Sequence, residues 1–373
     1  MIQKVIRGRE SLRRVPELME KLGMKHPLIV GSERLIPGLL RQEGLRNAPA
    51  FTGYHPNPDL ADAEAGVRLF QEKGCDSLIS LGGGSAMDTA KAVKSWLCAG
   101  SLEQVRMNRL EVRPIPHIAI PATAGSGAEA TFNAVVYEQG RKLSLSHESL
   151  LPEGVILDAS LLETLPEYHQ KSCALDALSQ GIESYWAKAA TEDSRVNAYL
   201  AILGVLDNLK AYLAGDPHAA EEVLDAAYQS GKAIRQTRTT AAHAMSYQIT
   251  KLLGLAHGHA CLVTLPVLWD GMCAAEETRP VMRELASRMR LGDPMMGSRL
   301  LRGLLIDLGM EAPAMPPEET LRELADSVNP ERLGNHPLAL DRKEIERIYR
   351  LAFRPVAEPE RQACLDIWRY YHA

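Results

Sequence analysis

The sequence predicts an α/β N-terminal domain followed by an all-helical C-terminal domain, with the break near residue 160. Three observations predict this division. Over residues 1–160, short apolar runs alternate with helical patterns, which is typical of a parallel sheet with helices on its faces. Glycine-rich turns follow two of these runs. Over residues 161–373, strand-like runs almost vanish and apolar residues recur at helical spacing.

The elements of the first domain can be placed in order along the chain. Three apolar runs are predicted to be buried strands: residues 27–31, 76–81 and 117–121. Helical patterns lie between them, at residues 59–73 and 86–97. The runs 135–137 and 141–145 flank Glu138-Gln139-Gly140, which predicts a small hairpin. In the second domain, helical patterns occupy residues 175–188, 195–214, 219–235, 239–253 and 280–290, and a loop is expected over residues 310–317.

The composition is that of a globular enzyme. Hydrophobic residues make up 46% of the 373 residues and charged residues 24%, which excludes a disordered chain. The formal net charge of −5 offers no basic footprint, so no nucleic-acid partner is expected. No apolar run is long enough to cross a bilayer, and the charged N-terminus is unlike a signal peptide. We therefore expect a cytoplasmic protein without a membrane partner.

A triple glycine marks the first candidate site. Gly82, Gly83, Gly84 and Ser85 follow a predicted strand and open a predicted helix. Glycines let backbone N–H groups approach a pyrophosphate closely, and the helix N-terminus adds partial positive charge. The segment matches neither the G-x-G-x-x-G fingerprint nor the P-loop, so a turn with structural duties only is the alternative.

A second glycine-bearing turn, at residues 121–131, also follows a predicted strand and is rich in small hydroxyl residues. Two such turns at the ends of neighbouring strands predict a long phosphorylated cofactor that lies across the edge of the sheet.

The predicted helices also carry candidate metal ligands. Asp176 and Gln180 are four residues apart and share a helix face. His243 and His257 are 14 residues apart, too far to share a metal on one straight helix, but residues 254–256 predict a break between them. Each histidine taken alone is more often a structural residue, so spacing leaves the site open. The six cysteines form no Cys-x-x-Cys pair, and we interpret them as free thiols rather than as a zinc site.

Five motifs in a fixed order resemble those of the iron-containing (group III) alcohol dehydrogenases. They are residues 82–91, the turn at 123–131, Asp176-Ala177-Leu178, His243-Ala244-Met245 and His257-Gly258. The resemblance covers nearly the whole chain. It implies a Rossmann-like N-terminal domain and a helical C-terminal domain, an architecture shared with dehydroquinate synthase. It also implies an NAD(P)-dependent dehydrogenase or reductase with a divalent metal, Fe²⁺ or Zn²⁺, and a homodimer.

The resemblance places the metal ligands at Asp176, Gln180, His243 and His257. Where the family has a histidine, this chain has Gln180, whose carbonyl oxygen is a weaker ligand than an imidazole. Three outcomes stay open: a metal held by Asp176 and the two histidines with Gln180 or water, a weakened site, or no metal. Tyr247 stands where many relatives have a second histidine that relays protons. Tyr247 and His257 are therefore the expected catalytic residues.

The resemblance also implies the cofactor site. Its expected residues lie in or near the two turns: Ser32, Gly82, Gly83, Gly84, Ser85, Asp88, Thr123, Ser126, Asn133 and Lys142. Relatives that favour NAD carry an acidic residue near Ser32, where a carboxylate repels a 2′-phosphate. Ser32 at this position and Arg34 nearby favour NADP(H), whereas Glu33 favours NAD(H), and both cofactors stay open.

Three further segments, residues 142–147, 179–186 and 238–247, resemble the branch that contains the phosphonoacetaldehyde reductases (hydroxyethylphosphonate dehydrogenases). A phosphonate needs cationic or hydrogen-bonding anchors, and we expect Arg238, Lys142 and His147 to supply them. Arg238 is expected at the start of the helix that carries His243. The expected reaction is the reduction of phosphonoacetaldehyde to 2-hydroxyethylphosphonate. The alternatives are sulfoacetaldehyde, a neutral short aldehyde or alcohol, the dehydroquinate synthase reaction, and a nucleotide-binding protein that has lost its metal.

Overall fold

The structure of the protein is a computed structural model, in which residues 2–110 and 115–372 are described. Two compact units make up the chain. The first runs to Leu165 and includes Ala214–Gly231, and the second comprises Pro166–Leu213 and the residues from Lys232 onward. The first unit thus extends past the expected boundary at residue 160 and gains part of helix α8 (Pro217–Thr237).

Close packing explains why the segment 214–231 belongs to the first unit. Gly231 of α8 approaches Gly127 so closely that a Cβ on either residue would overlap the backbone of the other. In addition, Arg7 Nε donates to Asp225 Oδ1 over 2.7 Å. An α8 residue with a side chain at position 231 would force this contact apart.

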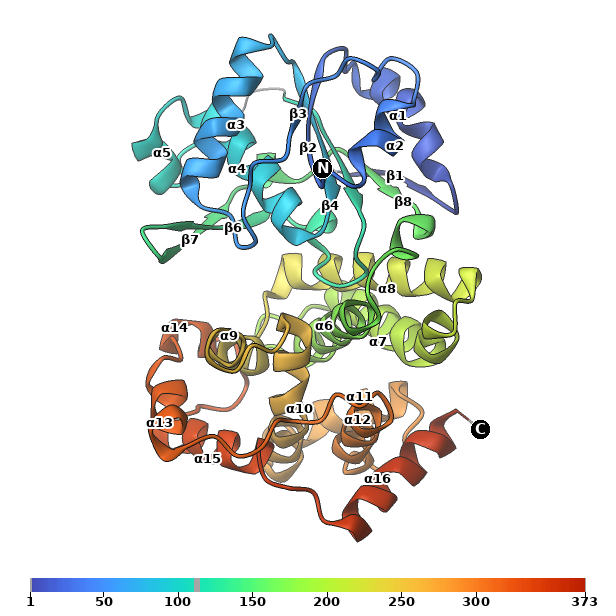
Figure 1. Ribbon diagram of the computed structural model, residues 1–373. Helices are drawn as coiled ribbons and strands as arrows, with labels where there is room; N and C mark the ends of the chain where they lie inside the picture. The colour runs from blue at the N-terminus through green and yellow to red at the C-terminus, as the bar shows by residue number, and fades with distance from the viewer. Residues whose placement is uncertain (1, 111–114, 373) are drawn as a thin grey trace. The chain divides into compact units, whose positions relative to one another are not determined.

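A six-stranded parallel sheet forms the centre of the first unit (Figure 1). Its strands, in spatial order, are β1 (Lys4–Arg7), β8 (Gly154–Leu157), β5 (His117–Pro121), β4 (Ser77–Gly82), β2 (Pro27–Gly31) and β3 (Ala50–Phe51). The three predicted strands are confirmed as β2, β4 and β5, which are neighbours within this sheet. Their near-continuous apolar runs match their burial on both faces.

Two apolar cores cover the two faces of the sheet, because successive side chains of a strand point in opposite directions. Leu28 and Leu78 face a core completed by α3 (Leu60–Glu72), α4 (Gly84–Ala99), α5 (Leu102–Arg106) and the hairpin of β6 (Asn133–Glu138) and β7 (Arg141–Ser146). Ile29 and Ile79 face a second core completed by α1 (Val15–Leu22) and α2 (Ile36–Leu40). Figure 1 shows these two groups of elements on opposite sides of the sheet. The predicted hairpin and the two predicted helices are confirmed.

The second unit is helical, as predicted (Figure 1). Its main helices are α6 (Glu167–Trp186), α7 (Glu192–Leu213), α9 (Ala241–Leu253), α10 (His257–Ala274), α11 (Arg279–Arg288), α12 (Met296–Asp307), α13 (Glu318–Asp326), α14 (Pro330–Leu333), α15 (Arg342–Ala352) and α16 (Glu358–Tyr371). None of the helices described for this chain is long and apolar enough to span a membrane.

A buried lysine joins α4 to the second glycine-bearing turn. The ammonium group of Lys91 is fully buried and donates to the carbonyl oxygen of Ala128 over 2.6 Å, to Thr131 Oγ1 over 3.0 Å and to the carbonyl oxygen of Asn133 over 2.9 Å. Burial lowers the pKa of Lys91 to about 8. Two of the three donors of the ammonium group bind this turn and the third binds the start of β6, so Lys91 fixes the turn and β6 against α4.

The Lys91→Met substitution should destabilise the first unit by about 2–4 kcal/mol, because it leaves three buried acceptors without their donor. The measurement is the urea midpoint, followed by circular dichroism. Lys73→Met, at an exposed position at the end of α3, is the control and should leave the midpoint unchanged. A Lys91→Met chain as stable as the control would show that the buried lysine does not hold the turn.

Candidate metal centre and cofactor turns

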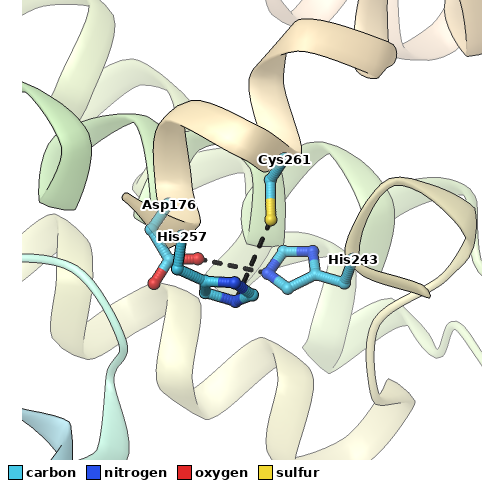
Figure 2. A group of neighbouring side chains, drawn as sticks. All are labelled: Asp176, His243, His257 and Cys261. Carbon is cyan, nitrogen blue, oxygen red and sulfur yellow. Dashed lines mark hydrogen bonds and ion pairs between the residues drawn. The ribbon is translucent and has the colours of Figure 1, made fainter. Parts of the chain in front are cut away.

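Four side chains from three helices of the second unit bring metal-ligating atoms together (Figure 2). They are Asp176 on α6, His243 on α9, and His257 and Cys261 on α10. One ligand atom from each lies within 4.8 Å of all the others. His243 Nε2 is 3.1 Å from Asp176 Oδ1, and Cys261 Sγ is 3.9 Å from His257 Nε2. Three of these residues are predicted from the sequence, and Cys261 is not.

Gly258 brings α10 against α6. A Cβ at Gly258 would lie 2.6 Å from the backbone nitrogen of Asp176 and closer still to the carbonyl oxygen of Ser172, so only glycine fits. The backbone N–H of His259 also donates to Ser172 Oγ over 3.2 Å. This contact sets His257 and Cys261, on either side of Gly258 along α10, next to Asp176.

The predicted break between the two histidines is confirmed. Helix α9 ends at Leu253, Gly254 adopts the left-handed conformation with φ of 72°, and α10 begins at His257. The chain therefore turns back, and the rings of His243 and His257 meet edge to face with centroids 5.3 Å apart. His243 and His257 are 14 residues apart, which is too far for the two side chains to share a metal on one straight helix. On two helices joined by a reversal of the chain, the two side chains can share one.

The buried carboxylate of Glu183, on α6, holds His243 and the start of α9. Glu183 Oε1 accepts from the backbone N–H groups of Thr240 and Ala242 over 3.1 and 2.8 Å and from the Thr240 hydroxyl over 2.6 Å. Glu183 Oε2 bonds to His243 Nδ1, so Nε2 faces Asp176. A carboxylate behind a histidine in this way fixes the ring of a metal ligand. Glu183 is not among the predicted site residues, although it follows Asp176 by two turns on the same helix face.

Gln180 contacts the cluster through its amide nitrogen. Gln180 Nε2 donates to Asp176 Oδ1 over 3.2 Å. The side chain is buried beside Asp176 on α6 and thereby fixes the orientation of the carboxylate. The residue expected as the fourth ligand is thus hydrogen-bonded to one of the other candidate ligands.

The charges within the cluster reinforce one another. Burial raises the pKa of Cys261, but the neighbouring His243 and His257 outweigh it and bring that pKa down to about 7. Burial lowers the pKa of His257, but Cys261 and Asp176 outweigh it and raise that pKa to about 9. Burial likewise opposes ionisation of Asp176, yet the hydrogen bond from His243 and the charges of both histidines hold its pKa below the usual value. Protonated His243 and His257 thus stabilise the anionic forms of Asp176 and Cys261, and a bound metal cation would take the place of the imidazole protons.

Two residues expected near the metal lie in different settings. The Tyr247 ring stacks on His257 with centroids 5.6 Å apart, and the Arg332 guanidinium lies 4.7 Å from the centre of the Tyr247 ring. The expectation that Arg238 begins the helix of His243 is wrong, because α9 begins at Ala241. Arg238 is exposed, in the left-handed conformation with φ of 62°, in the link that follows α8. Asn335 Nδ2 donates to the carbonyl oxygens on both sides of it, those of Thr237 and Thr239, and so fixes this link as a turn.

In the first unit, the two glycine-bearing turns lie against each other. They follow β4 and β5, which pair in parallel register with Gly82 opposite Pro121. A Cβ on Gly83 would lie 3.4 Å from the Thr123 side chain, and one on Gly84 would lie 3.2 Å from Ser126 Oγ. Gly83 is the N-cap of α4 and has no side chain with which to cap it. The turns therefore bring a helix N-terminus and small hydroxyl side chains to one edge of the sheet, which suits a phosphate.

The residues beside Ser32 use their side chains within the first unit. Ser32 follows β2, and its N–H donates to the Leu81 carbonyl oxygen over 3.1 Å. Glu33 accepts from the Thr52 hydroxyl over 3.2 Å, and one Arg34 nitrogen donates to the Thr164 carbonyl oxygen over 2.9 Å. Arginine has five N–H donors, so this single bond leaves others for a ligand.

The other expected cofactor and substrate residues of the first unit make contacts around the hairpin. Ser85 Oγ accepts from the Asn57 N–H over 3.4 Å, and Asp88 Oδ2 accepts from the Val135 N–H over 3.2 Å. Burial raises the pKa of Asp88 to about 6, although the charges of Lys91 and Lys142 oppose that shift.

Two further expected residues lie at the ends of the hairpin. The carbonyl oxygen of Asn133 binds Lys91, and His147 Nδ1 accepts from the N–H of Ser149 over 3.2 Å.

Comparison with known proteins supports the fold and identifies the family. Residues 3–159 match the sequence profile described as iron-containing alcohol dehydrogenase, and residues 171–353 match the C-terminal profile of the Fe-containing alcohol dehydrogenase family. A phosphonoacetaldehyde reductase from Streptomyces viridochromogenes is 30% identical over 363 residues, which cover 90% of each chain. An NAD-dependent methanol dehydrogenase from Bacillus methanolicus is 30% identical over 273 residues, which cover 69% of this chain and 71% of the relative.

A solved structure extends the likeness to three dimensions. The crystal structure of sulfoacetaldehyde reductase from Bifidobacterium kashiwanohense, in complex with NAD⁺, matches with a TM-score of 0.88 at 25% identity. The match covers 94% of this chain and 97% of that one. With both family profiles matched and the parallel sheet and helical unit observed, this chain belongs to the iron-containing alcohol dehydrogenase family of oxidoreductases.

Proposed function

We propose that this protein is an NAD(P)H-dependent, metal-assisted reductase that converts phosphonoacetaldehyde to 2-hydroxyethylphosphonate. The observation that carries the proposal is the buried cluster of Asp176, His243, His257 and Cys261, in a chain of this oxidoreductase family. An anionic two-carbon aldehyde is favoured because two relatives are named for such substrates, phosphonoacetaldehyde and sulfoacetaldehyde, each an aldehyde with a tetrahedral anionic group.

The residues of the cluster fit a divalent transition metal. A carboxylate oxygen, two imidazole nitrogens and a sulfur are ligands of Zn²⁺ and Fe²⁺, and the carboxylate of Glu183 orients His243 behind them. When bound, the metal supplies Lewis acidity that polarises the carbonyl group of an aldehyde. Asp176, His243 and His257 are the residues that would hold it.

The remaining roles fall to residues of both units. Reduction adds a hydride to the aldehyde carbon and a proton to the oxygen, so one aldehyde and one NAD(P)H give one alcohol and one NAD(P)⁺. In this proposal the turns at Gly82–Ser85 and Thr123–Ser126 bind the cofactor phosphates. Tyr247 holds the proton at Oη, and the guanidinium group of Arg238 binds the phosphonate. The exposed side chain of Arg238 starts from a backbone turn that Asn335 holds in place, which supports its assignment as the group that meets the anion.

The choice of nicotinamide cofactor belongs to the same proposal. Ser32 at the end of β2 places no carboxylate against a 2′-phosphate, and Arg34 keeps donors available, which together favour NADPH. The solved relative holds NAD⁺, so both cofactors are to be compared in every assay.

The first test is oxidation of NADPH by phosphonoacetaldehyde, with sulfoacetaldehyde and propanal at equal concentrations. The Arg238→Ala substitution should lower kcat/KM for phosphonoacetaldehyde about 10- to 100-fold, the value of a hydrogen bond to a charged group. Its effect on propanal should stay below about threefold, because propanal has no anion to bind. Arg235→Ala, in the last turn of α8, is the matched control. Equal losses for both aldehydes would contradict anion recognition by Arg238.

Removal of metal supplies a second test. Dialysis against a chelator should abolish aldehyde reduction, and added Zn²⁺ or Fe²⁺ should restore it, while NADPH binding measured by fluorescence persists. Full activity in a chain shown by elemental analysis to be free of metal would contradict a metal-assisted reaction. NADPH binding without turnover of any aldehyde, even with metal bound, would instead favour the non-catalytic alternative.

The Glu183→Gln substitution tests how His243 is positioned. The amide nitrogen of glutamine would donate to His243 Nδ1 and so leave the ring proton on Nε2, the atom that faces Asp176. We expect the Kd for Zn²⁺ to rise about 10- to 100-fold, as for other residues behind a metal ligand. Glu167→Gln, at an exposed position on α6, is the control. The Kd values are measured by competition with a chromophoric chelator, and an unchanged Kd would rule out this role.

A further inference from the structure

We propose that Cys261 is a metal ligand, so that the donor set of this protein is Asp176, His243, His257 and Cys261, with Gln180 outside it. The inference rests on the metal of the proposed function and goes beyond it by naming the ligand set. It is carried by the way α10 presents its side chains and by the orientation of Gln180.

His257 and Cys261 are one helical turn apart on α10 and share a face. With a Zn–N bond of about 2.0–2.1 Å and one Zn–S bond of about 2.3 Å, the ligand atoms of a tetrahedral ion lie about 3.3–3.6 Å apart. Cys261 Sγ lies 3.9 Å from His257 Nε2, and His243 Nε2 lies 3.1 Å from Asp176 Oδ1. Both separations are close to that range, and Figure 2 shows the sulfur pointing toward the two rings.

The surroundings of Cys261 set it apart from other buried cysteines. The residue is fully buried, and its sulfur faces imidazole rings on two helices and the carboxylate of Asp176. A buried cysteine that only fills space is packed among apolar side chains. Among the described residues, Cys261 is the one cysteine that belongs to a group of possible metal ligands.

Gln180 is oriented as a support for the carboxylate. Its Nε2 donates over 3.2 Å to Asp176 Oδ1, the same oxygen that faces His243. An amide nitrogen that donates a hydrogen bond has no lone pair for a metal, and the amide oxygen is a harder donor than a thiolate. Gln180 therefore fixes Asp176 as a ligand, and Cys261 supplies the remaining donor.

The ligand set has a chemical consequence. As the sulfur–metal bond forms, the thiol proton of Cys261 passes to solvent and the sulfur binds as a thiolate. A set with one thiolate is softer than a set of oxygen and nitrogen donors, and it favours Zn²⁺ over Fe²⁺. Since Zn²⁺ also binds more tightly than Fe²⁺ to most sites, metal preference alone does not test the proposal. The test must detect the sulfur.

X-ray absorption of the zinc-loaded wild-type chain tests the proposal directly. We expect one sulfur at about 2.3 Å from the metal beside nitrogen and oxygen atoms at about 2.0–2.1 Å. The Co²⁺-substituted chain should show a sulfur-to-cobalt charge-transfer absorption. Both signals should vanish in Cys261→Ser and persist in Cys273→Ser, a control cysteine near the end of the same helix. The Kd for Zn²⁺ should rise at least about 100-fold in Cys261→Ser, since loss of a ligand costs more than loss of its support.

A second variant separates ligation from a merely structural role. In the Cys261→Ser background, Gln180→His adds an imidazole one turn after Asp176 on α6 and should restore much of the Zn²⁺ affinity without the sulfur signal. Bound metal without sulfur in the wild-type chain would overturn the ligand assignment and leave the proposed reductase intact. A wild-type chain that binds no metal at all would overturn both the ligand assignment and the metal-assisted reaction.

Discussion

The contact between α6 and α10 at Gly258 is the constraint on which the metal cluster depends. Three of the four candidate ligands lie on these two helices, and only a residue without a side chain lets their backbones come so close. The fourth, His243, reaches the same point because Gly254 reverses the chain between α9 and α10 and because Glu183 anchors the start of α9 to α6. Gly258 joins α6 to α10, Gly254 joins α9 to α10, and Glu183 joins α6 to α9. Packing and hydrogen bonds therefore hold the donor atoms together without a metal. Preorganisation of this kind concentrates binding energy in the metal–ligand bonds.

The fold was largely predictable because its signals are local. Buried parallel strands read as short apolar runs, and the runs that became β2 and β5 match the observed strands residue for residue. The pairing of β4 with β5 could be anticipated from the two glycine-bearing turns that follow them. That residues 214–231 belong to the first unit could not be predicted. Their placement depends on the close approach of Gly231 to Gly127, and these two residues are far apart in the sequence. A helical pattern shows which face is apolar and does not show which domain that face packs against.

Part of the candidate site was also predictable, because some of its signals are local in the sequence. The positions of Asp176, His243 and His257 followed from motifs and from a glycine break, and the structure brings these three residues together. Cys261 is not predicted by Cys-x-x-Cys spacing, because its partner in the cluster is a histidine one turn earlier on the same helix. The periodic pattern predicts Arg238 at the start of α9, whereas a left-handed turn held by Asn335 separates it from that helix. Asn335 lies far from Arg238 in the sequence, so the spacing of apolar residues around Arg238 cannot predict the hydrogen bonds that Asn335 makes.

The charge of the proposed ligand set bears on how an anionic substrate is recognised. Three neutral imidazoles and one carboxylate leave a divalent ion with a net positive charge, whereas replacement of one imidazole by a thiolate leaves the centre neutral. A cationic centre attracts the phosphonate end of the substrate as well as the aldehyde oxygen, and the two ends compete for it. In the reaction proposed above, a neutral centre would attract the phosphonate less, and recognition of the anion would pass to cationic side chains such as Arg238. In the proposed enzyme, the thiolate of Cys261 and the guanidinium group of Arg238 would thus act together to direct the aldehyde, rather than the anion, toward the metal.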